Sequence, residues 1–268
     1  MPIINLNNVS FSYLNGNTPF NFENINITVG KGDFLTIMGP NGSGKSTLLN
    51  LISGIYLPET GEITLENIPL NRFTKKQIAR KIAFVPQTTY SAFPFSVYEI
   101  VMMGRTPYLN LFGLENNDDH NKVIEALRIM EIENLKNKGI NEVSGGEAQR
   151  AFIARALAQD TEIILLDEPN AHLDLQHQLS IFNLLCRLNL EKNLTIIMVS
   201  HDLILSGFYS TRTILMREGK IFKDGLTREV LNEENIQQTF GVNASVKYSE
   251  KFDNVIISIN PEHPKADG

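Results

Sequence analysis

Apolar and polar positions alternate in two early stretches of the chain and give way to uniformly apolar runs further on. Residues 3–13 and 22–29 alternate, which predicts antiparallel strands with one buried face. Uniformly apolar runs of strand length are typical of parallel strands buried on both faces. Four runs that are apolar throughout, or apolar except for one threonine, occur at residues 34–38, 82–85, 163–166 and 196–199. The pattern therefore predicts antiparallel strands near the N-terminus and buried strands of the parallel type beyond them.

Helical spacing replaces strand spacing between residues 88 and 140. Apolar residues recur there at helical intervals in two groups, Val97, Val101 and Met102, then Val123, Leu127 and Met130. We interpret residues 88–160 as a helical insert within a single domain of residues 1–260. A small extension is expected over residues 225–260, with a strand pair at 245–259, and residues 261–268 are expected to be a loose tail.

The first part of the insert is rich in aromatic residues, and a basic cluster precedes it. The aromatic residues are Tyr90, Phe93, Phe95, Tyr98, Tyr108 and Phe112. Most should be local core, and the exposed ones are candidates for contact with a partner. The basic cluster, Lys75, Lys76, Arg80 and Lys81, is expected on a short helix and is interpreted as a solvated face rather than a binding patch.

A glycine-rich loop connects the apolar run at residues 34–38 to a helix-forming run that begins at Ser46. The loop fits the pattern G-x-x-x-x-G-K-[ST], and its place between strand and helix favours nucleotide binding over an ordinary turn. Its glycines reach positive φ, so backbone N–H groups can turn toward a phosphate, and the following helix points its dipole at the same anion. Lys45 is predicted to contact the β- and γ-phosphates, and the Ser46 hydroxyl to ligate Mg²⁺. The predicted phosphate-binding residues are Gly39, Asn41, Gly42, Ser43, Gly44, Lys45, Ser46 and Thr47.

Polar side chains follow three of the predicted buried strands. The run at residues 163–166 ends in Asp167 and Glu168. The first acid can hold Mg²⁺ beside the loop, and the second is then placed to polarise a water that attacks the γ-phosphate. Gln87 follows another strand and can carry its amide to a ligand, although a loop position explains it equally well. His201 follows a third and is a candidate phosphate contact, although a lone histidine is more often structural.

Two further features are candidates for nucleotide contact. Ser144 and Glu147 form a capping box at the start of a helix, and Gly145 and Gly146 weaken that helix. Bare glycines at a helix N-terminus allow close approach of another group and form a second possible anion site. Tyr13 ends the first strand, where its ring can stack on a base or simply pack.

Composition limits the classes of protein to which the chain can belong. It has 268 residues, is 42% hydrophobic and carries a formal net charge of −6, with a pI near 5.5. This acidity argues against nucleic acid as the main partner. Cys186 is the only cysteine, so no internal disulfide is possible and a reducing compartment fits. No signal peptide is expected, and no apolar run reaches the roughly 18–20 residues of a membrane span, so any membrane part should be another chain.

Taken together, these motifs resemble the ATP-binding cassette family over roughly residues 3–230. The resemblance implies an α/β fold of the P-loop NTPase type. That fold has a parallel-core ATPase lobe, an antiparallel β subdomain and an α-helical subdomain. It also implies ATP and Mg²⁺ as ligands, with Ser46, Gln87 and Asp167 at the metal. Glu168, His201 and Gln87 would take part in catalysis, and Tyr13 would stack on adenine. Two copies would meet head to tail, so that Ser144, Gly145, Gly146 and Glu147 contact the other copy's ATP.

A narrower resemblance concerns three stretches that look like the cassettes of iron–siderophore, haem and vitamin B12 importers. They are residues 79–87, 103–108 and 154–159, and some molybdate or tungstate importers share them. This implies a motor subunit at the cytoplasmic face of the cell membrane. It would be bound to a separate permease and linked indirectly to a substrate-binding protein. The alternative is a soluble cassette that drives a cytosolic scaffold, as in iron–sulfur cluster assembly. Cassettes that act on DNA or ribosomes fit neither the length nor the charge.

The sequence departs from the family pattern at two places. Glu147 stands where glutamine is common, although importers of this type often carry glutamate. Residues 170–174 read Asn-Ala-His-Leu-Asp instead of the widespread ending with serine. Ala171 has no hydroxyl, so a hydrogen bond across the dimer from that position is not expected, and His172 is not interpreted as a metal ligand.

Overall fold

A six-stranded sheet forms the centre of the molecule. The computed structural model describes residues 1–13, 21–87, 93–110, 113–170, 173–251 and 254–260. The sheet order is β10-β9-β3-β8-β7-β6. Its strands are β3 (Phe34–Met38), β6 (Ile82–Val85), β7 (Ile163–Asp167), β8 (Thr195–Val199), β9 (Arg212–Arg217) and β10 (Lys220–Leu226). All neighbours are parallel except β9 and β10. The four uniformly apolar runs are thus adjacent strands, buried on both faces as predicted.

A second, antiparallel sheet lies against one side of the central sheet, with α1 (Lys45–Ile52) between them. Its order is β2-β1-β4-β5. The strands are β1 (Pro2–Ser12), β2 (Asn21–Gly30), β4 (Thr60–Leu65) and β5 (Ile68–Pro69). Leu48 and Leu51 of α1 share one apolar cluster with residues of both sheets. This cluster holds α1, and therefore the loop before it, in a fixed position over the central sheet.

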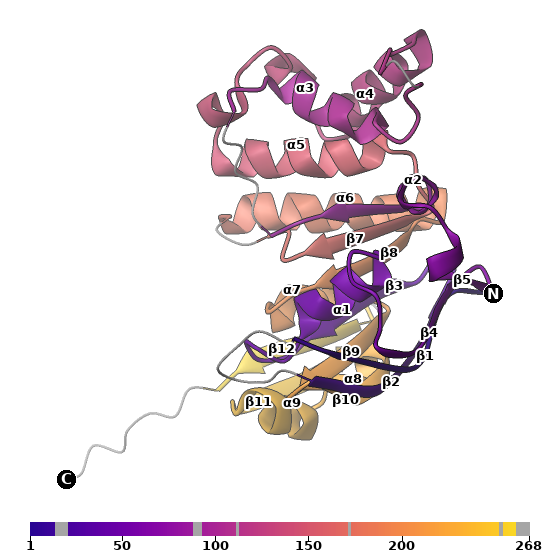
Figure 1. Cartoon of the computed structure of the whole chain (residues 1–268). Coiled ribbons are helices and arrows are strands. Elements are labelled where there is room, and N and C mark those ends of the chain that lie inside the picture. Colours follow the sequence, from indigo (N-terminus) through magenta and orange to yellow (C-terminus); the bar gives the residue numbers. More distant parts are fainter. Residues whose placement is uncertain (14–20, 88–92, 111–112, 171–172, 252–253, 261–268) are drawn as a thin grey trace.

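A helical layer covers the other side of the central sheet (Figure 1). Its members are α3 (Val97–Met102), η2 (Met103–Arg105), α4 (Asn117–Ile129), η3 (Glu133–Leu135), η4 (Ile140–Glu142) and α5 (Gly145–Ala158). The helix α6 (Leu175–Lys192) lies between this layer and the sheet. Ser96, Asn116 and Ser144 begin α3, α4 and α5 with capping boxes, which explains where these helices start.

The remaining elements complete the two ends of the molecule. On the side of β6 lie η1 (Leu70–Arg72) and α2 (Lys75–Ala79). At the C-terminal end are α7 (Leu203–Tyr209), α8 (Thr227–Val230), α9 (Glu233–Phe240) and a hairpin of β11 (Ala244–Ser249) and β12 (Asn254–Ile259). The expected strand pair is therefore present, and the expected tail at 261–268 lies outside the described residues. Within the described part of the chain, no helix combines the length and apolarity needed to cross a bilayer.

Candidate functional site

The glycine-rich loop lies at the carboxyl end of β3 and leads directly into α1. Gly39 has a φ of 155°, and a Cβ there would lie 2.1 Å from the Met216 carbonyl oxygen, so only glycine fits. Gly44 occupies the N-cap of α1 in the left-handed region, with a φ of 100°. No described side chain caps this helix. The first N–H groups of α1 are consequently available to an anion, as its dipole favours.

Lys45 closes the loop on itself. Its side chain is buried, and Nζ donates to the carbonyl oxygens of Gly39 at 2.9 Å and Pro40 at 3.0 Å. Burial lowers the pKa of the Lys45 ammonium, and the charges of Glu168 and Asp167 partly oppose that shift. A phosphate would give this buried cation the counter-charge that it lacks within the loop.

Ser46 and Asp167 bring oxygen atoms together at the carboxyl end of β7. The Ser46 hydroxyl donates to Asp167 Oδ1 at 3.1 Å. Burial raises the pKa of Asp167, as does the nearby Glu168 charge, against the lowering effects of the Ser46 hydrogen bond and Lys45. A hydroxyl beside a carboxylate, next to a phosphate site, is the donor set that Mg²⁺ prefers. These residues therefore fit the ion that the sequence implies.

Glu168, Gln87 and His201 converge although they come from three different strands. Glu168 Oε2 accepts a hydrogen bond from Gln87 Nε2 at 2.9 Å and lies 3.4 Å from His201 Nδ1. The Glu168 backbone has a φ of 48°, in the left-handed region that a glutamate rarely adopts. Strain of this kind, about 1–3 kcal/mol, is commonly found at functional sites. The Glu168 side chain lines the same cavity as Lys45 and Ser46 of the loop.

A cavity of 870 Å³ lies between the glycine-rich loop and the group formed by Glu168, Gln87 and His201. Its lining consists of Tyr13, Asn41, Gly42, Gly44, Lys45, Ser46, Thr47, Gln87, Glu168 and His201. Gly39, Ser43 and Asp167 are not among the lining residues, but the lining residues Lys45 and Ser46 bond to the Gly39 carbonyl oxygen and to Asp167. Ser43 Oγ is buried without a hydrogen-bond partner among the described residues. The structure therefore places all the predicted phosphate, metal and catalytic residues in or beside one cavity.

Tyr13 lies at the edge of the cavity within an aromatic group. Its hydroxyl lies 3.1 Å from Thr47 Oγ1, and its ring meets Phe11 and Tyr56 edge-on at 5.2 Å and 5.8 Å. The sequence analysis did not identify Tyr56, which follows α1 in the chain and stacks on Phe11 at 5.3 Å. No local pattern could have shown this, because Tyr56 meets Phe11 and Tyr13 only through tertiary packing. Stacking of Tyr13 on a base remains a prediction.

The segment Ser144–Glu147 does not line this cavity. Glu147 Oε2 accepts from the Ser144 backbone N–H at 2.8 Å and from its hydroxyl at 2.9 Å, and these bonds lower the pKa of Glu147. A Cβ at Gly146 would lie 2.8 Å from a ring carbon of His177, so packing within the chain accounts for that glycine. At Gly145, no described atom lies within 4 Å of the Cβ position. The fold of one chain therefore does not explain Gly145.

Several positions singled out in the sequence lie outside the described residues. They are Ala171, His172, Tyr90 and Phe112. Beside the first two, Asn170 is buried, and its Oδ1 has no partner among the described residues. Asp174 begins α6 by accepting from the His177 backbone N–H at 2.9 Å.

The fold and the cavity define an ATPase of the P-loop class, and comparison with known proteins identifies its family. Residues 22–171 match the profile of the family described as "ABC transporter". The chain belongs to this family, which confirms the resemblance, the fold class and the ATPase activity expected from the sequence.

Relatives and solved structures agree with this family over most of the chain. The "Iron(3+)-hydroxamate import ATP-binding protein FhuC" of Bacillus subtilis (strain 168) is 39% identical over 224 residues, which cover 84% of this chain and 83% of FhuC. The structure described as "An inward-facing conformation of a putative metal-chelate type ABC transporter" has a TM-score of 0.85 and 31% identity, and the match covers 98% of both chains. A dimeric cassette, MJ0796 bound to ADP and Pi in a post-hydrolysis state, has a TM-score of 0.73 and 33% identity, covering 84% of this chain and 98% of that one.

Proposed function

We propose that this chain is the ATP-hydrolysing motor subunit of an importer for a chelated metal compound, such as an iron–siderophore, haem or cobalamin. The names of FhuC and of the metal-chelate transporter support the class of cargo. The observation that carries the motor function is the hydrogen bond between Gln87 and Glu168. It joins Gln87, which follows β6 and precedes the helical layer in the chain, to the carboxylate beside the phosphate loop. Nothing in the described structure favours the alternative, a cassette that drives a cytosolic scaffold.

ATP binding uses the loop and the first turn of α1. The phosphates accept hydrogen bonds from the loop N–H groups, and Lys45 exchanges its carbonyl contacts for the β- and γ-phosphates. Ser46 and Asp167 would hold Mg²⁺, with the Gln87 amide oxygen as a further ligand. When bound, the ion supplies positive charge beside the β- and γ-phosphate oxygens. Tyr13 stacks on the adenine from the edge of the cavity.

Hydrolysis depends on Glu168. Its carboxylate orients the attacking water by accepting a hydrogen bond and accepts the water's proton as the oxygen attacks the γ-phosphorus. His201 reaches the same side of the cavity and donates to a γ-phosphate oxygen. The charge that develops on the transferred phosphoryl group is stabilised by Lys45 and the loop N–H groups. Gln87 keeps the Glu168 carboxylate in position through its amide N–H.

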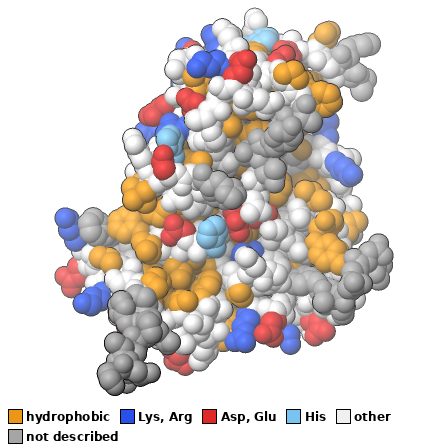
Figure 2. Space-filling view, turned by 90° about the vertical axis from the view of Figure 1, so that its left-hand side faces the viewer, with side chains coloured by type: hydrophobic (Ala, Val, Ile, Leu, Met, Phe, Trp, Pro, Cys, Tyr) orange, Lys and Arg blue, Asp and Glu red, His pale blue; other side chains and the backbone are white. Residues whose placement is uncertain are grey.

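A second copy of the chain completes each site. The segment Ser144–Glu147 lies outside its own chain's cavity, and Gly145 has open space beside it. A head-to-tail partner would place the N-terminus of α5 against the γ-phosphate, where the helix dipole favours an anion. The dimeric form of the MJ0796 cassette supports this arrangement. On the face shown in Figure 2, hydrophobic patches flank a central group of acidic side chains and a histidine, which suits burial against a partner.

The permease contacts a groove in the helical layer. The groove has a volume of 660 Å³ and is lined by Ser96, Tyr98, Glu99, Met102, Met103, Thr106, Leu109, Glu115 and Asn137. Of the described aromatic residues in this region, Phe93 is 66% exposed, whereas Phe95 and Tyr98 pack partly against the core. A permease docked in this groove would hold the chain at the cytoplasmic face of the membrane, bound to the permease rather than inserted.

Purification of the native complex tests this proposal. A tagged chain should co-purify with an integral membrane permease, and transport of a radiolabelled iron chelate should require the intact chain. Lys45→Ala should abolish that transport without preventing complex formation, because the permease groove does not involve the phosphate loop. Recovery of a cytosolic scaffold in place of a permease would overturn the proposal in favour of the alternative.

A further inference from the structure

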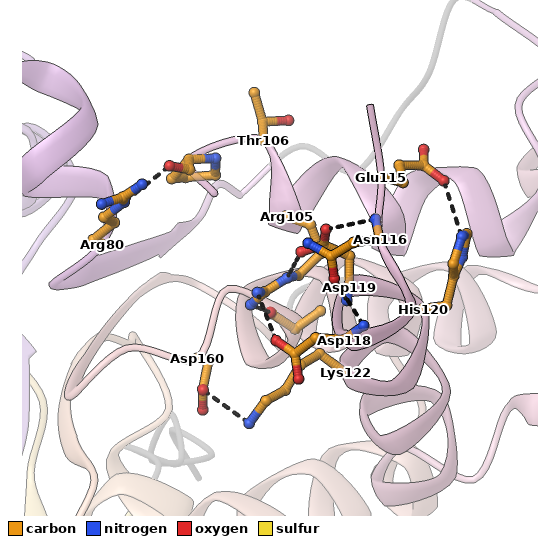
Figure 3. Close-up of polar contacts among 12 residues, drawn as sticks. Arg80, Arg105, Thr106, Glu115, Asn116, Asp118, Asp119, His120, Lys122 and Asp160 are labelled. Carbon is orange, nitrogen blue, oxygen red and sulfur yellow. Dashed lines mark hydrogen bonds and ion pairs between the residues drawn. The ribbon is translucent and has the colours of Figure 1, made fainter. Parts of the chain in front are cut away.

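Arg105 is a buried cation in the helical layer that the ATPase site does not use. It is 3% exposed, and its Nε donates to Asp119 Oδ1 at 2.9 Å. Asp119 is 1% exposed and also accepts from the Asn116 backbone N–H at 3.1 Å, at the start of α4. Arg105 Nη1 donates to the carbonyl of Ala158 at 2.8 Å, at the end of α5. Figure 3 shows this arginine surrounded by the N-terminal residues of α4. Arg105 therefore ties η2 rigidly to both α4 and α5.

Tyr108 connects Arg105 to Arg80, which lies at the end of α2, outside the helical layer. The Tyr108 ring contacts two guanidinium groups, with Arg105 at 4.1 Å and Arg80 at 5.1 Å from the ring centroid. Arg80 ends α2, outside the helical layer, and its Nε donates to the carbonyl of Pro107 at 2.9 Å (Figure 3). Planar guanidinium groups suit such stacking better than an ammonium group does.

The basic cluster is therefore not simply a solvated face, as the sequence analysis had it. Lys76 Nζ donates to the Leu109 carbonyl at 2.9 Å, and Lys81 pairs with Glu66 at 2.7 Å. Gln159, just beyond α5, donates from Nε2 to the carbonyls of Ala79 and Ile82, the latter at 2.9 Å. The start of β6 is consequently held by groups from the helical layer. Periodicity could not show this, because every partner is distant in the sequence.

The segment 103–109 has two sides with different neighbours. Met103, Thr106 and Leu109 line the groove described above. Arg105 and Tyr108 lie between these positions in the sequence. Arg105 contacts Asp119 and Ala158, and Tyr108 contacts Arg105 and Arg80. Gly104 permits close packing on α5, since a Cβ there would lie 2.1 Å from the Arg155 carbonyl oxygen. Any displacement of this segment at the groove must therefore act on the contacts behind it.

We propose that Arg80, Tyr108 and Arg105 form a coupling joint, in which they are positioning residues that transmit occupation of the groove to Gln87. A displacement of residues 103–109 would move Tyr108 and, through its ring, Arg80, which lies just before β6. The strand β6 is largely buried and pairs with β7, and Gln87 follows its other end. Gln87 in turn bonds to Glu168, so a displacement of the joint caused by occupation of the groove would reach the hydrolytic carboxylate, whereas an empty groove leaves that carboxylate undisturbed. This inference rests on the proposed function, because it takes the permease as the occupant of the groove.

The test compares ring and guanidinium variants in the isolated chain and in the permease complex. Tyr108→Ala removes the ring that both guanidinium groups contact, and Arg80→Lys replaces one of these groups by an ammonium group. Tyr108→Phe keeps the ring and its contacts with both guanidinium groups. Arg72→Lys is the matched control for the arginine, because Arg72 is exposed in the same region and makes no hydrogen bond or ion pair to the helical layer among the described residues. None of these residues lines the ATP cavity, so basal ATPase activity should remain within about twofold of wild type in all four variants.

Stimulation by the permease is the first measurement. In the complex, Tyr108→Ala and Arg80→Lys should reduce permease-stimulated ATPase by at least about fivefold, the lower range of typical coupling between sites. Tyr108→Phe and Arg72→Lys should retain it. All four should still co-purify with the permease. Full stimulation in Tyr108→Ala, or loss of the complex itself, would overturn the joint, because the ring would then be either irrelevant or part of the docking surface.

Hydrogen exchange in the isolated chain gives a second measurement that needs no permease. Tyr108→Ala should increase amide exchange over residues 79–87, while Tyr108→Phe should not. Unchanged exchange would refute the mechanical connection between the joint and Gln87. If exchange changes as expected but the wild-type chain binds no permease, the proposed importer function fails while the connection stands. The two ideas can thus fail separately.

Discussion

Replacement of Glu168 by glutamine separates ATP binding from hydrolysis. The variant keeps the shape of the side chain, and its amide oxygen can still accept the hydrogen bond that Gln87 donates at 2.9 Å. It removes the negative charge and the ability to accept a proton. The side chain is only 16% exposed, so bulk water cannot replace the carboxylate in this position.

The expected loss follows from the role of a general base. Removal of such a group typically costs about 10²–10⁴ in rate, which corresponds to roughly 2.7–5.4 kcal/mol in the barrier. The affinity for ATP, in contrast to the rate of hydrolysis, should stay the same or increase. The negative charge of Glu168 interacts with the Lys45 ammonium across the cavity. The same charge would repel a γ-phosphate bound beside Lys45. Its neutralisation should therefore leave the dissociation constant for ATP within about threefold of wild type, or lower it.

Single-turnover phosphate release and a nucleotide titration measure the two effects. Glu162→Gln is the matched control, because Glu162 precedes the opposite end of β7, is 54% exposed and pairs with Lys31. It should behave as wild type in both assays. Hydrolysis by Glu168→Gln within about threefold of wild type would refute the assignment of Glu168 as the base. Loss of ATP binding would show instead that its role is structural.

Three further predictions concern binding, pH and packing. Lys45→Ala should weaken ATP binding by roughly tenfold or more in a titration, since charge-assisted hydrogen bonds are each worth about 1.5–3 kcal/mol; unchanged affinity would contradict the loop assignment. Burial raises the pKa of Asp167 in the folded chain, so its charged form opposes folding once the pH rises through that pKa. Asp167→Asn should therefore raise the Tm of the nucleotide-free chain near neutral pH. The gain should shrink as the pH falls toward the range where Asp167 is protonated, and a lower Tm near neutral pH would contradict this. Gly104→Ala should destabilise the chain by about 1–3 kcal/mol in urea unfolding, because its Cβ would meet the Arg155 carbonyl oxygen, whereas Gly145→Ala, with open space around it, should not.

The sequence by itself determined the elements whose cause is local. The apolar runs are all strands of the central sheet, because strands covered on both faces carry apolar side chains at nearly every position. The phosphate loop followed from glycine conformations and the helix after it, which are properties of neighbouring residues. The acids at the end of β7 were also predictable, because parallel strands bring their carboxyl ends to one edge of the sheet.

Tertiary structure decided the features that depend on distant residues. The hydrogen bond between Gln87 and Glu168 joins positions 81 residues apart in the sequence. Local sequence patterns do not show which residues so far apart in the chain come into contact. The surroundings of Gly145 and Gly146 also differ. His177 packs against Gly146, whereas no described atom lies within 4 Å of the Cβ position of Gly145. The stack of Arg80, Tyr108 and Arg105 likewise exists only because α2 lies beside the helical layer. Local sequence fixes backbone conformation and burial, whereas the packing of whole elements fixes which side chains meet.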